Sequence, residues 1–225
     1  MKKDLVDQPR VALLTGGQGA LAQAIATVLT EAGWMVHAPS KSELDVRDPA
    51  SIAAWFAGRE RLDLLVNNAG LRRDAPLAQL TEQDWNEVMQ TNLRGAWQCC
   101  RAALPIMARQ GGGHILNIGS YTARHGVAGQ TAYGAAKAGL LALTQSLAAE
   151  CGSDNIRVNA VLPGWMRTPF TGGLSPATHQ AARARHHLQR FNTPEHTARF
   201  IAALLEMAHT SGQIFQLDSR PGSWL

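Results

Sequence analysis

The stretch VALLTGGQGALAQAIATVL, residues 11–29, decides the fold. Its first five residues form a short apolar run typical of a buried strand, and residues 20–29 have the apolar spacing of a helix. Between them, Gly16, Gly17 and Gly19 form a glycine-rich turn. Backbone N–H groups at the start of a helix bind anions, and glycine lets a phosphate approach closely. The stretch therefore predicts a strand–turn–helix unit with a phosphate site, although glycine turns of this kind also occur without a ligand.

Strands and helices alternate along the rest of the chain. Further strands are expected at residues 34–38, 62–66, 114–118, 157–162 and 213–217. Helix starts are indicated by Asp48-Pro49, by the capping-box spacing from Thr81 to Asp84, by Ser175-Pro176 and by Thr193-Pro194. Only eight residues separate Val36 from Asp45, too few for an additional helix and strand. The expected fold is α/β, a Rossmann-type doubly wound parallel sheet of six strands in a single domain over residues 1–225.

Composition narrows the class of protein. A chain of 225 residues with 45% hydrophobic content can form one full core. It contains no run of 18 apolar residues and no apolar leader, so we expect a cytoplasmic protein with no membrane partner. Cys99, Cys100 and Cys151 have no metal-ligand spacing, which predicts reduced, mostly buried thiols and no metal site.

Basic residues gather at Arg72-Arg73 and again between Arg183 and Arg190, and the formal net charge is +4. No nucleic-acid motif and no basic–aromatic interleaving accompany them, so we expect a solvated helix face and no nucleic-acid partner. A phosphate-bearing cofactor or an acidic carrier protein is the better functional interpretation of the charge. His186 and His187 are adjacent and point to different sides of a helix, so we do not expect them to bind a metal.

The catalytic candidates are Tyr133 and Lys137, with Ser120 thirteen positions before the tyrosine. Four residues apart on a helix, the phenol and the ammonium share one face. A free tyrosine, with a pKa of about 10, is a poor acid at neutral pH, and a fixed cation beside it makes it a usable proton donor. Ser120, at the end of a strand, is placed to hold a substrate oxygen. Together these groups suit protonation of a carbonyl oxygen while a hydride attacks its carbon.

Over nearly its whole length, the chain resembles the short-chain dehydrogenase/reductase family. The motifs that carry the resemblance are Thr15-Gly16-Gly17, Asn67-Asn68-Ala69-Gly70, Thr91-Asn92-Leu93, Ile118-Gly119-Ser120, Tyr133-Gly134-Ala135-Ala136-Lys137, and Pro163-Gly164 followed by Thr168. The resemblance implies that Tyr133 is the general acid/base and that Lys137 lowers its pKa and holds the nicotinamide ribose. It further implies that Ser120 positions the carbonyl and that Asn92 supports a proton-relay water. Such proteins commonly pack the helices carrying Asn92 and Tyr133 across subunits, so a homo-oligomer, a dimer or a tetramer, is expected.

Cofactor contacts are expected along one set of loops. They are Gly16, Gln18, Gly19, Ala20, Leu21, Ser40, Lys41, Asp45, Val46, Asn68, Ala69, Gly70, Tyr133, Lys137, Pro163, Gly164 and Thr168. Ala20 and Ala22 stand where the family's turn usually carries glycine, and a methyl group at either place can crowd the pyrophosphate. Asp45-Val46 resembles the pair that contacts the adenine.

The end of the second strand indicates which cofactor is used. An acidic residue there would accept hydrogen bonds from the ribose hydroxyls of NAD, whereas this chain has Ser40 and Lys41, which suit a 2′-phosphate. We therefore expect NADP(H) to be favoured over NAD(H). Lys41 also has a plain interpretation as an exposed loop lysine, and Glu43 is the residue that would reverse the preference.

Different parts of the sequence resemble different branches of the family. The stretches around the catalytic residues, and the Arg73-Asp74 pair, resemble 3-oxoacyl-carrier-protein reductases, which implies a carrier-linked or small-molecule carbonyl substrate. Arg72, Arg73 and Arg109 would then form a positive approach surface. The turn Gly16 to Leu21, with the shortened region after the second strand, looks instead like dihydropteridine reductase. Ser219-Arg220 replaces a usual glycine pair. A nucleotide-sensing protein with little turnover is a third possibility, and it does not explain why all four catalytic positions are kept.

Overall fold

The computed structural model describes residues 8–172 and 175–220, and one parallel sheet organises them. Its strands are β1 (Val11–Leu14), β2 (Met35–His37), β3 (Leu64–Asn67), β4 (Gly113–Ile118), β5 (Ile156–Leu162) and β6 (Ile214–Gln216). They lie in the order β2-β1-β3-β4-β5-β6, so β1 pairs with both β2 and β3 and the winding direction reverses there. The expected six-stranded, Rossmann-type sheet is confirmed, and each strand begins and ends within two residues of the expected range.

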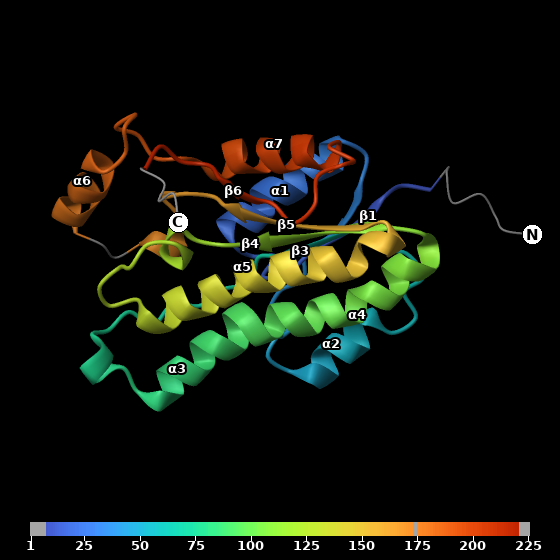
Figure 1. Ribbon diagram of the computed structural model, residues 1–225, viewed down its shortest axis with the longest axis horizontal. Coiled ribbons are helices and arrows are strands. Elements are labelled where there is room, and N and C mark those ends of the chain that lie inside the picture. The colour runs from blue at the N-terminus through green and yellow to red at the C-terminus, as the bar shows by residue number, and fades with distance from the viewer. Residues whose placement is uncertain (1–7, 173–174, 221–225) are drawn as a thin grey trace, which may run out of the picture.

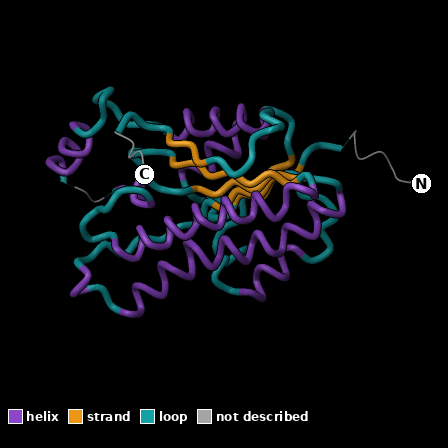
Figure 2. The backbone as a smooth tube through the Cα atoms, in the orientation of Figure 1, coloured by secondary structure: helices purple, strands orange, loops and turns teal. Residues whose placement is uncertain are grey.

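Helices cover both faces of the sheet (Figures 1 and 2). On one face lie α1 (Ala20–Glu31) and α7 (Pro194–Leu205). On the other lie α2 (Pro49–Phe56), α4 (Gly95–Gln110) and α5 (Thr131–Cys151). Successive strand residues point to opposite faces, so Leu13 packs under α2 and α4 while Leu14 packs under α1 and α7. Apolar side chains on both faces explain the near-continuous apolar runs of the strands.

The expected helix starts are confirmed by their caps. The Asp48 carboxylate accepts a hydrogen bond from the Ala50 amide, and Thr81 Oγ1 accepts one from the amide of Asp84 at the start of α3 (Glu82–Met89). Ser175 caps α6 (Pro176–Ala184) and Thr193 caps α7 in the same way. Each cap satisfies a backbone donor that the helix leaves unpaired, which is why these starts can be read from sequence.

The long helix that carries Asn92 has an irregular centre. A π-helical segment, Gln90–Arg94, separates α3 from α4. Asn92 Nδ2 donates to the carbonyl oxygens of Val88 and Leu71, at 2.9 and 2.8 Å. A π-helical turn is often found at functional sites, and nothing in the local sequence pattern predicted this one.

Two further observations concern the cysteines and the helices. Cys99, Cys100 and Cys151 are free and buried, as expected. Within the described ranges, no helix is both long enough and apolar enough to cross a membrane.

The short connection after β2 packs closely against α4. A Cβ atom on Gly95 would lie 2.8 Å from Val46 Cγ2 and 2.9 Å from the Val46 backbone oxygen. We expect Gly95→Ala to lower the free energy of unfolding by about 1–3 kcal/mol, because the backbone oxygen cannot rotate away. Urea denaturation measures the change.

Gly152→Ala is the matched control for that prediction. Gly152 has helical backbone angles, and nothing lies within 4 Å of an added Cβ atom. This variant should be as stable as the parent or slightly more stable. Equal stability of the two variants would show that the contact between α4 and Val46 is not tight.

Candidate active site

One cavity of about 780 Å³ opens at the carboxyl ends of the parallel strands. It extends from the glycine-rich turn after β1, past the loop after β3, to Ser120 after β4 and the loop after β5. Parallel sheets bind ligands in this place, next to the point where strand order reverses. In Figure 1 this end of the sheet faces α6.

The three catalytic candidates meet on the wall of this cavity. Ser120, Tyr133 and Lys137 all line it, and the Ser120 side chain is hydrogen-bonded to the Tyr133 phenol. Lys137 Nζ donates to the carbonyl oxygen of Ile118 at 2.7 Å and lies 5.8 Å from the centre of the Tyr133 ring. Groups at the end of β4 therefore hold the side chains of Tyr133 and Lys137, which belong to the first turns of α5. Their predicted catalytic roles stay predictions.

Burial dominates the electrostatics of the pair. It raises the pKa of Tyr133 to about 12, against the opposing effects of the Ser120 hydrogen bond and the Arg72 charge. It lowers the pKa of Lys137 to about 8. At neutral pH the phenol is thus protonated, the form that can donate a proton, and the lysine is mostly charged. Lys137 is not among the groups that lower the Tyr133 pKa, so that predicted effect stays a prediction.

Asn92 lies beside the cavity but is not part of its wall. Its side chain is 1% exposed, and its amide group bonds to the backbone at Leu71 and Val88. Leu71 and Thr91 do line the cavity. Asn92 therefore positions the loop after β3 in this structure, and its part in a proton relay stays a prediction.

The glycine-rich turn has free donors for an anion. Gly16, Gln18, Gly19, Ala20 and Leu21 line the cavity, and no side chain caps the first turn of α1. The turn can take its shape because Gly16 has φ +66°, a conformation that favours glycine. The amides at the start of α1 therefore fit a pyrophosphate.

Burial removes the concern for only one of the two alanines. Ala22 is fully buried in the core between α1 and the sheet, so its methyl group points away from the cavity. Ala20 alone remains on the wall.

At the far end of the cavity, the loop after β2 contributes Lys41, Asp45 and Val46, and their contacts with a cofactor stay a prediction. Ser40 does not reach the wall. Its amide and its Oγ both donate to the Glu43 carboxylate at 2.8 Å, and these hydrogen bonds lower the pKa of Glu43. Ser40, one of the two residues that we assigned to a 2′-phosphate, is thus bonded to an acidic side chain, and Lys41 is the one that lines the cavity.

The remaining cofactor candidates all lie on the wall. These are Asn68, Ala69, Gly70, Pro163, Gly164 and Thr168. Asn68 Nδ2 donates to the Thr15 and Gly16 carbonyl oxygens, which fixes the turn.

Two expectations about basic residues are wrong. Arg109 is exposed beside Gln110, whose side chain bonds to the backbone of Leu62 before β3, at the opposite edge of the sheet from the cavity. Arg109 therefore cannot flank the cavity of its own chain. Arg73, instead of being a free cation, pairs with Asp84 and Glu87.

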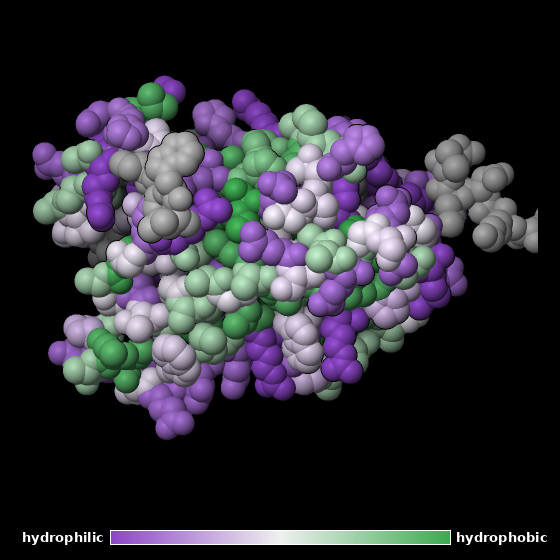
Figure 3. Space-filling model, in the orientation of Figure 1, coloured by the Kyte–Doolittle hydropathy of each residue, from purple (hydrophilic) through white to green (hydrophobic). Residues whose placement is uncertain are grey.

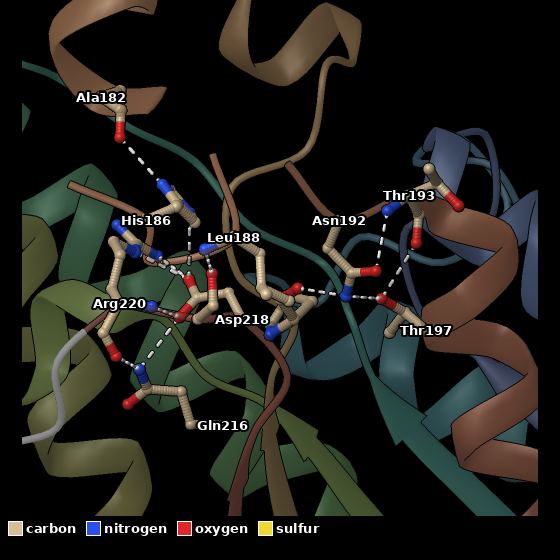
Figure 4. A network of polar contacts seen from close by, with 11 residues as sticks. Ala182, His186, Leu188, Asn192, Thr193, Thr197, Gln216, Asp218 and Arg220 are labelled. Atoms are coloured by element: carbon tan, nitrogen blue, oxygen red, sulfur yellow. Dashed lines mark hydrogen bonds and ion pairs between the residues drawn. The ribbon is translucent and has the colours of Figure 1, made fainter. Parts of the chain in front are cut away.

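The segment from Arg183 to Arg190 is only partly the solvated face that we expected. His186 is 0% exposed, and its Nε2 lies 3.7 Å from the Asp218 carboxylate (Figure 4). Arg185 is exposed but lines the cavity. His186 is buried because it contacts the segment after β6. The residue pattern of the helix gives no information about that contact.

Sequence reasoning also missed part of the wall. Besides Arg185, it contains Arg47, Trp165, Phe170 and Arg220, next to Arg72, which was expected on the approach to the site. Phe170 lies 6.2 Å from the Tyr133 ring, and the Arg72 guanidinium lies 5.2 Å from Phe170. The sequence signal for Arg220 was Ser219-Arg220 in place of a glycine pair, because a large cation at that position needs a counter-charge or an anionic ligand.

Comparison with known proteins defines the class. The sequence profile of a family described as enoyl-(acyl carrier protein) reductase matches residues 10–219. The 3-oxoacyl-[acyl-carrier-protein] reductase FabG of Vibrio cholerae is 34% identical over 236 aligned positions, which cover 93% of this chain and 96% of the relative. The chain belongs to the short-chain dehydrogenase/reductase family and is an NAD(P)-dependent oxidoreductase.

Two other relatives match a shorter part. The FabG protein of Thermotoga maritima is 41% identical over 160 residues, and carbonyl reductase family member 4 of Xenopus tropicalis is 41% identical over 157 residues. Each alignment covers 70% of this chain and 65% of the relative.

The pKa of Lys137 gives a prediction for pH dependence. Because the ammonium form predominates below a pKa of about 8, its positive charge is lost as the pH rises through that value. We expect the rate of carbonyl reduction to be level below pH 8 and to fall above it, since a neutral lysine cannot stabilise a developing phenolate. A kcat profile between pH 6 and pH 10 measures this, and a flat profile would contradict it.

Proposed function

We propose that this chain is an NADPH-dependent carbonyl reductase that acts on a 3-oxoacyl thioester, with Tyr133 as the general acid. The observation that carries the proposal is a buried, protonated phenol beside Ser120, in the same cavity as the uncapped start of α1. An anion site and a proton donor in one cavity are what hydride transfer to a carbonyl requires.

The mechanism assigns one task to each side chain. The nicotinamide cofactor, when bound, supplies the hydride. Ser120 donates a hydrogen bond to the substrate carbonyl oxygen and polarises the carbon. Tyr133 transfers its proton to that oxygen as the carbon is reduced, so a ketone becomes a secondary alcohol. The Lys137 ammonium stabilises the phenolate that remains.

The substrate class rests on the relatives and on the wall beyond Tyr133. Two of the relatives carry the name 3-oxoacyl-[acyl-carrier-protein] reductase, and a third is named as a carbonyl reductase. The cavity wall includes Met166, Phe170 and Val127, which offer apolar surface to an acyl chain, and Phe170 lies beside the Tyr133 ring. A dihydropteridine is supported by the resemblance of the cofactor turn and of the shortened region after the second strand.

Tyr133→Phe tests the general acid. This change removes only the hydroxyl group, so we expect kcat for a 3-oxoacyl thioester to fall about a hundredfold or more while the Kd for NADPH stays nearly unchanged. Steady-state kinetics and a fluorescence titration of NADPH measure the two quantities.

The chain offers a matched control, because its second tyrosine, Tyr121, also lines the cavity. The Tyr121 ring stacks on His125 at 4.0 Å, and Tyr121→Phe keeps that ring. This variant should retain most of the activity. Full turnover by Tyr133→Phe would overturn the assignment, and efficient reduction of a quinonoid dihydropterin with inert 3-oxoacyl thioesters would overturn the substrate class.

The preference for NADPH is proposed to depend on Lys41. Lys41 lines the cavity at the end that would receive the adenosine, whereas Ser40 is bonded to Glu43. A 2′-phosphate is attracted by the lysine and repelled by the carboxylate, so the two side chains have opposite effects on NADPH and little effect on NADH.

Paired variants separate these effects. Lys41→Ala should weaken NADPH binding about tenfold, and Glu43→Gln should strengthen it, with the Kd for NADH changed less than threefold in both. Calorimetric titration with each cofactor measures this. Tighter binding of NADH than NADPH by the parent protein would refute the proposed preference.

A further inference from the structure

The cavity wall carries more positively charged than negatively charged side chains. The charged side chains on it are Lys41, Asp45, Arg47, Arg72, Asp74, Lys137, Arg185 and Arg220. Two arginines pair on the wall itself, Arg47 with Asp45 at 2.7 Å and Arg72 with Asp74 at 3.4 Å. Lys137 donates to a backbone carbonyl, as described above.

Arg220 lies on the wall, and Asp218, which does not line the cavity, holds it in place (Figure 4). Its Nε donates to Asp218 Oδ2 at 2.7 Å, and its backbone amide donates to Asp218 Oδ1 at 3.2 Å. Gln216 Nε2 also donates to Oδ1, at 2.9 Å, and the Asp218 side chain is 1% exposed. These donors use both oxygens, so the Asp218 carboxylate is bonded to Arg220 and Gln216, and His186 also lies close to it.

Two cations are left over, at opposite ends of the cavity. Among residues 8–172 and 175–220, no carboxylate lies within ion-pair distance of Lys41 or Arg185. Lys41 belongs to the cofactor end. Arg185 follows α6 and belongs to the opposite, substrate end, where Figure 3 shows mainly hydrophilic side chains over α6.

The surroundings of Arg185 are positively charged. The guanidinium groups of Arg220, Arg124 and Arg185 all lower the pKa of His125, after its burial, and only Asp218 opposes them. His125 Nε2 is buried and has no hydrogen-bond partner among the described residues. Three guanidinium groups with one committed carboxylate leave an unbalanced positive field at this end of the cavity, which attracts an anion.

We propose that Arg185, supported by Arg220 and its Asp218 partner, binds an anionic group of the substrate, a phosphate or a carboxylate remote from the reacting carbonyl. An arginine fork matches the oxygens of either group. The inference rests on the proposed function and specifies it: the preferred 3-oxoacyl thioester carries a negative charge outside its reacting part.

The test uses thioesters that differ only in charge. S-acetoacetyl-pantetheine is compared with its 4′-phosphate, and a 3-oxoacyl-pantetheine that ends in a methyl group is compared with one that ends in a carboxylate. Arg185→Gln should raise KM about tenfold for one of the charged partners and change KM less than twofold for the neutral ones. A rise in KM for the 4′-phosphate identifies the anion as a phosphate, and a rise for the terminal carboxylate identifies it as a carboxylate.

Arg190→Gln is the matched control, because Arg190 is exposed, loses the same charge and does not line the cavity. It should leave KM for every thioester unchanged. An equal effect of both variants, or no effect of Arg185→Gln on either charged substrate, would overturn the inference. So would an equal loss for neutral and charged substrates, which indicates a purely structural role at the end of α6.

A binding measurement separates this inference from the proposed function. The same thioesters are titrated by calorimetry into protein with oxidised cofactor, which cannot deliver a hydride. If none of the thioesters is reduced by NADPH, the proposed function fails, and the calorimetric Kd ratios of parent and Arg185→Gln still decide the role of Arg185.

Discussion

The buried hydroxyl of Thr15 joins the two strands on which the active site depends. Its Oγ1 accepts hydrogen bonds from the Asn68 and Ala69 amides, both at 3.0 Å, and donates to the Val66 carbonyl at 3.3 Å. One side chain at the end of β1 thereby fixes the loop that leaves β3. Gly16 follows directly, and a Cβ atom there would lie 2.9 Å from Ala69 Cα. The glycine turn and the loop after β3 can approach this closely because Gly16 has no Cβ atom, and hydrogen bonds of Thr15 and Asn68 hold them together.

A second constraint is the burial of two titratable groups in the first turns of α5. An ammonium and a phenol are costly to place away from water unless polar partners are present. The carbonyl of Ile118 and the hydroxyl of Ser120 provide those partners from the end of β4. The polar groups of the site are therefore held by the sheet itself. The same burial raises the pKa of Tyr133, which favours the neutral phenol, and lowers the pKa of Lys137.

The segment after β6 has a different part in the structure. Asp218 gathers Arg220, Gln216 and His186, and so connects the last strand with the end of α6. Arg220 in turn lies 3.7 Å from the Tyr121 ring, next to Ser120. A cation in place of a small residue thus links the loop after β4 with the end of α6 through one buried carboxylate.

The sequence by itself determined the features that depend on near neighbours. Strand and helix order follow from apolar periodicity, and helix starts such as Asp48 and Thr193 follow from caps that act within three residues. The four-residue spacing of Tyr133 and Lys137 places both on one helix face, and the short segment after Val36 limits the sheet to six strands.

Only the tertiary structure decided which distant groups meet. The Asn92 side chain of the π-helical turn bonds to the backbone of Leu71, twenty-one residues away. Burial of His186 depends on Asp218, and the position of Arg109 depends on the direction in which α4 crosses the sheet. Periodicity and capping act over one or two turns of chain, whereas these contacts join segments that only the packed sheet brings together, so the local pattern contains no trace of them.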